Sequence, residues 1–281
     1  MQMRFNWLTA VLAVALLTSV TASGLLLSSN SQLSSDNSAS ATRLQMNSIL
    51  SQGQLVAQAE IKKLDALAAN LGMDLGPHGL NGTATRALMN ATMAANANII
   101  SILTYNTSGI VIAAEPYTNV EGRNLSGDVI VQKLLITKMP VMSNVFKTVE
   151  GPMGAVLAAP VFDTTGRFIG GVSIVFNPNR MMESKLPQLL NGTSLTFWSM
   201  QNDGLLLYDE DPTQVGKNLL GPDYAAFPSL QALAWRMVNE SSGYGIYNFA
   251  PTAQNVVNTE CYWTNTGAHG VSWRLVIVHR L

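Results

Sequence analysis

The sequence contains one cysteine, three histidines and few charged residues. Of its 281 residues, 12% are charged and the formal net charge is −1, whereas a typical soluble domain is about 25% charged. The lone Cys261 excludes an internal disulfide, and the histidines offer no zinc-type spacing. No cluster of Lys and Arg supplies the positive field that nucleic-acid binding needs. We therefore expect no metal, no cofactor and no nucleic-acid partner, and a buried Cys261 in a strand.

The sequence also lacks the patterns of common catalytic sites. It has no Gly-x-Ser-x-Gly elbow, phosphate-binding loop or dinucleotide fingerprint. The acidic run at 209–211 is most simply a solvated turn and not an acid–base pair. None of His78, His269 and His279 stands near a Ser or Cys in a way that suggests a nucleophile–base pair. We predict that the protein is not an enzyme.

An uncharged segment runs from Phe5 to Leu27. A helix of about 20 apolar residues spans a bilayer core. Arg4 precedes the segment, while the Ser- and Asn-rich residues 28–41 carry no Lys or Arg, so the rest of the chain is expected outside the cell membrane. The alternative is a signal peptide with its core at Leu8–Leu17 and cleavage near 20–22, which would leave a secreted protein. Under both interpretations, the rest of the chain is exported from the cytoplasm.

After an N-terminal anchor or uncleaved signal at 1–28, residues 29–41 are predicted to form a linker and residues 42–77 a long α-helix. The helix carries apolar residues at seven-residue intervals: Leu50, Ala57, Leu64 and Leu71. Such a stripe could join two copies of the chain as a homodimer. It could also lie on the chain's own domain.

Two later segments, 106–127 and 201–221, share one pattern. In each, a polar turn ending in Gly leads into a short apolar strand, an acidic residue with Pro, and then Gly-basic-Asn-Leu. Two hairpins, with turns at Gly166 and Gly267, follow in the same order. Two matched pairs in the same order predict a duplicated module of helices and strands.

With these motifs, residues 40–281 resemble the double Cache family, the PAS-like extracellular sensor domains of chemoreceptors and histidine kinases. The resemblance implies an α+β fold: a membrane-spanning helix, a long helix, and two tandem modules, each with a central antiparallel sheet. The membrane-distal module would be 78–190 and the membrane-proximal module 191–281. The motifs that carry the resemblance are Gly109–Ala113, Gly122–Leu125, Ala158–Gly166, Asp203–Asp209, Val215–Leu219 and Ser242–Phe249.

The resemblance also implies that a small ligand lies between the sheet and the crossover loop of the membrane-distal module. Relatives that recognise free amino acids use an Arg-x-Trp-Tyr run in the crossover and an Asp on the last strand. Here the crossover reads GDVIVQKLL and the last strand offers Ser173. An amino group needs an anion or an aromatic cage to replace its hydration, so a neutral or weakly polar ligand is favoured. The matching positions are Tyr105, Tyr117, Ser143, Asn144, Phe146, Ala159 and Ser173.

These features predict an extracytoplasmic small-molecule sensing module anchored by one N-terminal helix. Because no output domain follows the last strand, the module is expected to act through a separate signalling protein. The alternative is a cell-surface structural or adhesion protein that retains the fold and binds nothing. Candidate N-glycosylation sites are the sequon asparagines Asn81, Asn90, Asn106, Asn124, Asn191 and Asn239.

Overall fold

The computed structural model describes residues 7–148, 151–250 and 256–281, with side chains from residue 37 onward. The chain divides into two units at Asn47. The first contains the N-terminal part of helix α1 (Trp7–Leu75), and the second contains the rest of α1 and all the strands. The predicted membrane span, Phe5 to Leu27, lies outside the residues whose side chains are described. Among the described residues, no helix combines the length and apolarity needed to cross a bilayer.

Helix α1 differs from the sequence prediction in its extent. Residues 29–41, which were expected to form a linker, are helical. The segment is rich in Ser and Asn, which are only moderate helix formers, but it contains neither Gly nor Pro. Because nothing in it breaks the backbone pattern, the helix continues through it.

The apolar stripe of α1 packs on the chain's own sheets. Leu50, Ala57, Leu64 and Leu71 are 5%, 3%, 0% and 2% exposed. Gly53 allows the helix to approach closely, because a β-carbon there would come 2.8 Å from the ring of Phe197. The stripe is therefore used within one chain, and a homodimer through α1 remains a prediction.

A six-stranded antiparallel sheet forms the first module. Its order is β2-β1-β6-β5-β3, with β4 paired to β5. Helix α2 packs on β1 and β2, and helix α3 packs on β5 and β6. The elements are α2 (Thr83–Ala94), β1 (Ile99–Asn106), β2 (Val111–Glu115), η1 (Thr118–Val120), α3 (Val129–Thr137), β3 (Val141–Met142), β4 (Phe146–Lys147), β5 (Met153–Phe162) and β6 (Phe168–Phe176).

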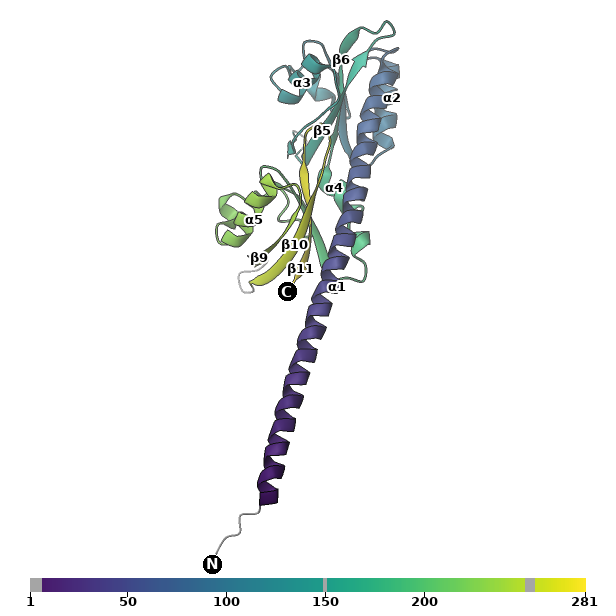
Figure 1. Ribbon diagram of the computed structural model, residues 1–281. Coiled ribbons are helices and arrows are strands. Elements are labelled where there is room, and N and C mark those ends of the chain that lie inside the picture. The colour runs from purple at the N-terminus through teal and green to yellow at the C-terminus, as the bar shows by residue number, and fades with distance from the viewer. Residues whose placement is uncertain (1–6, 149–150, 251–255) are drawn as a thin grey trace, which may run out of the picture. The chain divides into compact units, whose positions relative to one another are not determined.

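A five-stranded antiparallel sheet, ordered β8-β7-β11-β10-β9, forms the second module. In Figure 1, the part of α1 from Ser48 onward runs along one side of both sheets, and α3 and α5 lie on the other side. The elements are α4 (Pro178–Glu183), η2 (Pro187–Leu190), β7 (Leu195–Gln201), β8 (Leu206–Asp209), η3 (Pro222–Tyr224), α5 (Pro228–Asn239), β9 (Gly243–Phe249), β10 (Val257–Thr266) and β11 (Trp273–Arg280). The α+β class, the long helix and the two antiparallel sheets are as predicted.

The two modules repeat the same turn in atomic detail. Leu125 N donates to Gly109 O over 2.8 Å, and Leu219 N donates to Gly204 O over 2.9 Å. Gly109 and Gly204 have φ values of 76° and 89°, a region that glycine occupies without strain. The second glycine of each copy behaves alike, since Gly122 and Gly216 have φ values of 79° and 86°. The repeated sequence pattern thus encodes one backbone conformation built twice.

Arg123 and Lys217, the basic residues of the repeat, serve this turn through their backbone. The carbonyl of Arg123 accepts from Val111 N over 2.9 Å, and that of Lys217 accepts from Leu206 N over 2.8 Å. These bonds close the loop against the strand that follows the first glycine. Because both bonds use the main chain, the turn itself does not require a basic side chain at this position.

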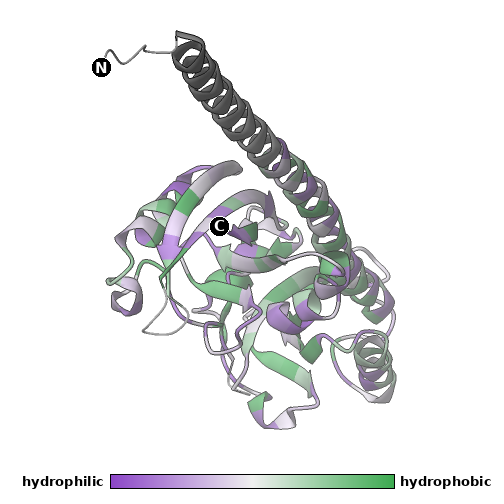
Figure 2. Cartoon of the chain, turned by 90° about the horizontal axis from the view of Figure 1, so that it is seen from below, coloured by the Kyte–Doolittle hydropathy of each residue, from purple (hydrophilic) through white to green (hydrophobic). Residues whose placement is uncertain are grey.

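Each sheet has an apolar core on the side that carries α3 or α5. In the second module, Trp198, Trp263, Tyr247 and Leu233 fill this side. Cys261 is buried there as expected, and burial raises the pKa of its thiol to about 12. In Figure 2, many of the residues within the strands are coloured as apolar.

Candidate functional site

A cavity of about 720 Å³ lies between the sheet of the first module and its crossover. Its floor comes from alternate residues of neighbouring strands. Ser101 and Leu103 of β1 pair with Val175 and Ser173 of β6, and Val156 of β5 pairs with Val175. Because side chains at alternate positions of a strand point to the same face, these residues form one surface beneath the cavity.

The crossover between β2 and β3 forms the opposite wall. Helix α3 begins at an N-cap residue, Asp128, whose carboxylate accepts from Ile130 N at 2.8 Å and Val131 N at 3.1 Å. Ile130 and Val131 line the cavity, together with Leu125 from the preceding loop. The cap fixes the start of α3 and so places this apolar wall over the sheet.

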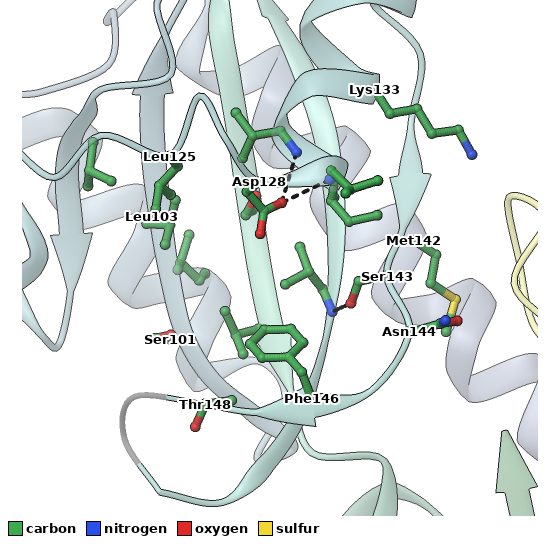
Figure 3. Close-up of a pocket in the computed structure, with 18 of the residues that line it drawn as sticks. Ser101, Leu103, Leu125, Asp128, Lys133, Met142, Ser143, Asn144, Phe146 and Thr148 are labelled. Carbon is green, nitrogen blue, oxygen red and sulfur yellow. Dashed lines mark hydrogen bonds between the residues drawn. The ribbon is translucent and has the colours of Figure 1, made fainter. Parts of the chain in front are cut away.

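The segment around β4 supplies the aromatic side of the cavity. Phe146 is 43% exposed, which is unusual for a large apolar ring, and it lines the space together with Val145 and Asn144. In Figure 3 the Phe146 ring and the Asp128 carboxylate point into the same space. Tyr117, 38% exposed, adds a second aromatic from the crossover loop.

A few buried hydroxyl groups give the cavity its polarity. Ser143, Thr148, Ser101 and Ser173 are each 4–6% exposed. The Ser143 hydroxyl accepts from Val156 N over 2.8 Å, and the Thr148 hydroxyl donates to Pro152 O over 2.9 Å. These two bonds stabilise the segment between β3 and β5.

Asp128 brings a carboxylate to the cavity, although it is not among the site residues predicted from the sequence. The signal for it was present, because Asp followed by an apolar run is a helix N-cap pattern. The sequence could not show that this cap faces the sheet across the cavity. Charge at the site also comes from Arg123 and Lys133, which line the same space.

Five of the seven residues implied by the family resemblance line the cavity: Tyr117, Ser143, Asn144, Phe146 and Ser173. Tyr105 and Ala159 do not. Tyr105 is fully buried in the apolar cluster next to the cavity, and burial raises the pKa of its hydroxyl. Ala159 points to the other face of the sheet, where its β-carbon would lie 3.4 Å from one built on Gly72 of α1.

The corresponding face of the second module has little free space. A cavity of about 40 Å³ remains there. Trp198, Tyr224, Tyr247 and Phe249 surround it. Large side chains thus fill in the second module the position that is open in the first.

The sequon asparagines lie mostly at the surface. Asn106 is half-buried, and its side-chain oxygen accepts from Ser108 N and Ile110 N. Glycosylation of these residues remains a prediction. The exposed ones are Asn81, Asn90, Asn124, Asn191 and Asn239.

Comparison with known proteins identifies the same kind of domain. Residues 59–178 match the family model described as the HK/GC/Chemotaxis protein-like sensor domain. This region covers the end of α1 and nearly all of the first module, including most of the cavity. No curated protein matches the sequence.

Solved structures resemble the chain over most of its length. An extracellular ligand-binding receptor from Desulfohalobium retbaense is 28% identical, with a TM-score of 0.69 over 84% of this chain. The chain spans 40% of the length of that receptor.

Two chemoreceptor domains have the same fold at lower identity. The ligand-binding domain of the Pseudomonas aeruginosa amino acid chemoreceptor PctC, in complex with GABA, is 17% identical. Its TM-score is 0.56, over 83% of this chain and 99% of that domain. The Pseudomonas fluorescens chemoreceptor CtaA, in complex with L-alanine, is 12% identical, with a TM-score of 0.59 over 83% and 95% of the two chains. The chain therefore has the Cache-type fold of the extracellular sensor domains of chemoreceptors and histidine kinases, and its residues 59–178 carry the sequence signature of that sensor family.

Proposed function

We propose that the chain is an extracytoplasmic sensor that binds a small, neutral or weakly polar molecule in the cavity of the first module. The open cavity of about 720 Å³ is the observation that carries this proposal. Small-molecule sites typically enclose about 300–1,000 Å³, with apolar walls and a few placed polar groups. The apolar floor and the aromatic edge at Phe146 fit that description.

A non-binding structural or adhesion role is less well supported. A domain that keeps the fold without a ligand would be expected to fill this space with side chains, because an empty apolar cavity costs stability. The second module is filled in that way by residues such as Trp198 and Tyr247. The contrast between two copies of one module favours binding in the first.

We further propose that the apolar segment Phe5–Leu27 holds the protein at the membrane and that a separate signalling protein receives its output. The uncharged segment after Arg4 supports the attachment to the membrane. Because the relatives are sensor domains, we propose binding and not catalysis as the activity. Membrane fractionation, with N-terminal sequencing of the mature chain, distinguishes an anchor from a cleaved leader.

A thermal-shift screen of the full-length protein against small metabolites tests ligand binding. A binding molecule should raise the Tm, and Phe146→Ala should abolish the rise because the ring lines the cavity. Phe162→Ala is the matched control. Phe162 is 40% exposed, close to the 43% of Phe146, and packs edge-on to Phe168 away from the cavity. If a broad library leaves the Tm of the wild type unchanged, the proposal is wrong.

A further inference from the structure

The wall of the cavity is completed by a hairpin from the second module. His269, Gly270 and Val271, between β10 and β11, line the cavity of the first module. Val145, another lining residue, donates its backbone N–H to the side-chain oxygen of Gln201 on β7 over 2.6 Å. The cavity is thus assembled from both modules, although its floor belongs to the first alone.

The same hairpin is bonded to helix α1 by side chains on one face of the helix. Gln58 accepts from Thr266 Oγ1 at 2.9 Å and from Gly267 N at 3.1 Å, and it donates to Gly267 O at 2.9 Å. Gln54, one turn earlier, donates to Asn265 O over 2.8 Å. Residues four apart on a helix are neighbours on its surface, so the two glutamines form hydrogen bonds with consecutive residues of the hairpin.

His269 joins the cavity wall directly to the helix. Its Nε2 lies 2.8 Å from Oδ1 of Asp65, and the two side chains are 25% and 30% exposed. On its other side, Lys133 Nζ of helix α3 donates to the backbone oxygen of His269 over 3.4 Å. One residue therefore contacts α1, the cavity and the crossover helix that covers the cavity.

The hairpin has a defined backbone shape. Gly267 has a φ of 145°, and a β-carbon there would collide with the carbonyl oxygen of Val271. His269 has a φ of 52°, in the left-handed region that few non-glycine residues occupy. The hairpin therefore adopts a specific backbone conformation at the cavity wall.

We infer that the hairpin Asn265–Val271 couples occupancy of the cavity to helix α1. This inference rests on the proposed function, and it names the regulation of that site. A ligand can shift a conformational equilibrium only through interactions that differ between two states. A molecule that touches the wall at His269–Val271 changes the energy of one hairpin position relative to another. The contacts with Gln54, Gln58 and Asp65 then convert that change into a response of α1.

Hydrogen exchange with a fluorescent probe in the cavity tests the coupling in the full-length protein. N-phenyl-1-naphthylamine is a neutral apolar probe whose fluorescence rises on binding, and loss of the signal in Phe146→Ala locates it in the cavity. In the wild type, the probe should change amide exchange in α1 between residues 54 and 65. In the double variant Gln58→Ala/Asp65→Ala, whose two residues do not line the cavity, the probe should bind within about 3-fold of the wild-type affinity, while the change in α1 should largely disappear.

Gln52→Ala provides the matched control. Gln52 lies on the same helix, is exposed, and makes its side-chain hydrogen bonds to Ser48 within α1. This variant should retain the full exchange response. Bound probe with no response of α1 in the wild type, or a full response in the double variant, overturns the inference while the proposed function stands.

Failure of the probe to bind the wild type counts against the proposed function and not against the coupling. In that case the variant Ser173→Phe supplies the occupant, because Ser173 lies on the cavity floor. Exchange in α1 should then differ between Ser173→Phe and the wild type, and the difference should be lost when Gln58→Ala and Asp65→Ala are added. An unchanged α1 in Ser173→Phe overturns the inference.

Discussion

Nη2 of Arg86 lies 2.8 Å from Oε1 of Glu121, so a cation on helix α2 holds the loop that carries Tyr117 at the cavity edge. The same guanidinium lies 2.9 Å from Glu115 at the end of β2. Glu121 also accepts from Ala114 N over 3.0 Å. The two carboxylates and the strand end are thereby fixed together, and this network predicts how the loop responds to mutation and to acid.

Arg86→Ala should destabilise the loop more than the molecule as a whole. The three side chains are 15–29% exposed, so solvent screens the pairs, and the loss should be about 1 kcal/mol. Limited proteolysis between residues 115 and 127 should become faster. Arg167→Ala is the control, because Arg167 is 79% exposed in its pair with Asp163 and should change neither quantity. Equal proteolysis of the two variants would contradict the role of Arg86.

The Arg86 network should also weaken in acid. The hydrogen bond from Arg86 holds the pKa of Glu121 below its usual value. An acid whose pKa is lowered by folding adds stability above its unfolded pKa, and this stability is lost as the pH falls through the folded value. The difference in unfolding free energy between wild type and Arg86→Ala should thus be constant near neutrality and shrink below about pH 4. Urea titrations at several pH values measure it.

Gly53→Ala should destabilise the protein, although alanine is normally favoured over glycine within a helix by about 1 kcal/mol. The new β-carbon would come 2.8 Å from Cζ of Phe197 and 3.2 Å from Leu275. Both neighbours are almost fully buried and cannot move aside freely. We expect a lower Tm, with part of the loss restored by adding Phe197→Leu, in a double-mutant cycle. A higher Tm for Gly53→Ala would show that α1 does not pack this closely.

Local sequence signals predicted much of the fold, because the chemistry they reflect is local. Gly109 and Gly204 each form a turn with positive φ. Because the sequence pattern around them is repeated, it predicted two copies of one module. It is harder to predict which face of a sheet a given side chain points to, since a shift of one residue exchanges the two faces. This is why Ala159 points toward α1 while its neighbour Ala158 packs on the cavity side.

Contacts between distant segments could not be read from the sequence. His269 appeared there only as a histidine in a hairpin turn, and its place in the cavity wall depends on how the two modules pack. Gln54 and Gln58 likewise resemble ordinary surface residues of a helix. Their partners lie more than 200 residues away, at separations of 211 and 209. Only the assembled tertiary structure brings these groups together.

Asp209→Asn should stabilise the protein at neutral pH and have little effect in acid. Burial raises the pKa of Asp209 to about 6. An acid whose pKa is raised by folding lowers stability as the pH rises through the window between its unfolded and folded values, here about pH 4 to 6. Removing the charge should gain about 1–2 kcal/mol at pH 7.5 and nearly nothing at pH 3.5, measured by urea unfolding.

Asp211→Asn is the control for Asp209→Asn, because it should change stability at neutral pH in the opposite direction. Hydrogen bonds from Thr213 and Gln214 lower the pKa of Asp211, so its ionised form is favoured in the folded protein. Asp211→Asn should therefore reduce stability at pH 7.5. A gain for both variants would mean that the run 209–211 responds to its net negative charge and not to the burial of Asp209.

Arg274→Ala should be among the most destabilising single changes in the second module. Arg274 is 4% exposed, and its Nε donates to Met237 O at 2.6 Å and Glu240 O at 3.0 Å, at the end of helix α5. Its loss removes the donor to Met237 O and leaves Glu240 O with the bond from Trp263 Nε1. It also removes a cation from a helix C-terminus, and the total cost should be about 2–4 kcal/mol. Arg274→Lys should recover little, because one ammonium cannot replace the planar fork. Arg280→Ala, at an exposed strand end, should change the unfolding free energy by less than about 0.5 kcal/mol.

Substitutions of Asp128 can distinguish its role as the N-cap of α3 from the effect of its charge on ligand binding. Asparagine is as good an N-cap as aspartate, whereas alanine loses about 1 kcal/mol. Asp128→Asn should therefore retain the Tm, and Asp128→Ala should lower it. Binding of the neutral probe N-phenyl-1-naphthylamine should be equal in Asp128→Asn and wild type, while any metabolite that carries an ammonium group should bind at least about 5-fold more weakly to both variants. If an ammonium-bearing hit from the screen bound Asp128→Asn as tightly as wild type, the carboxylate would serve the helix alone, and recognition would fall to the hydroxyls of the cavity floor.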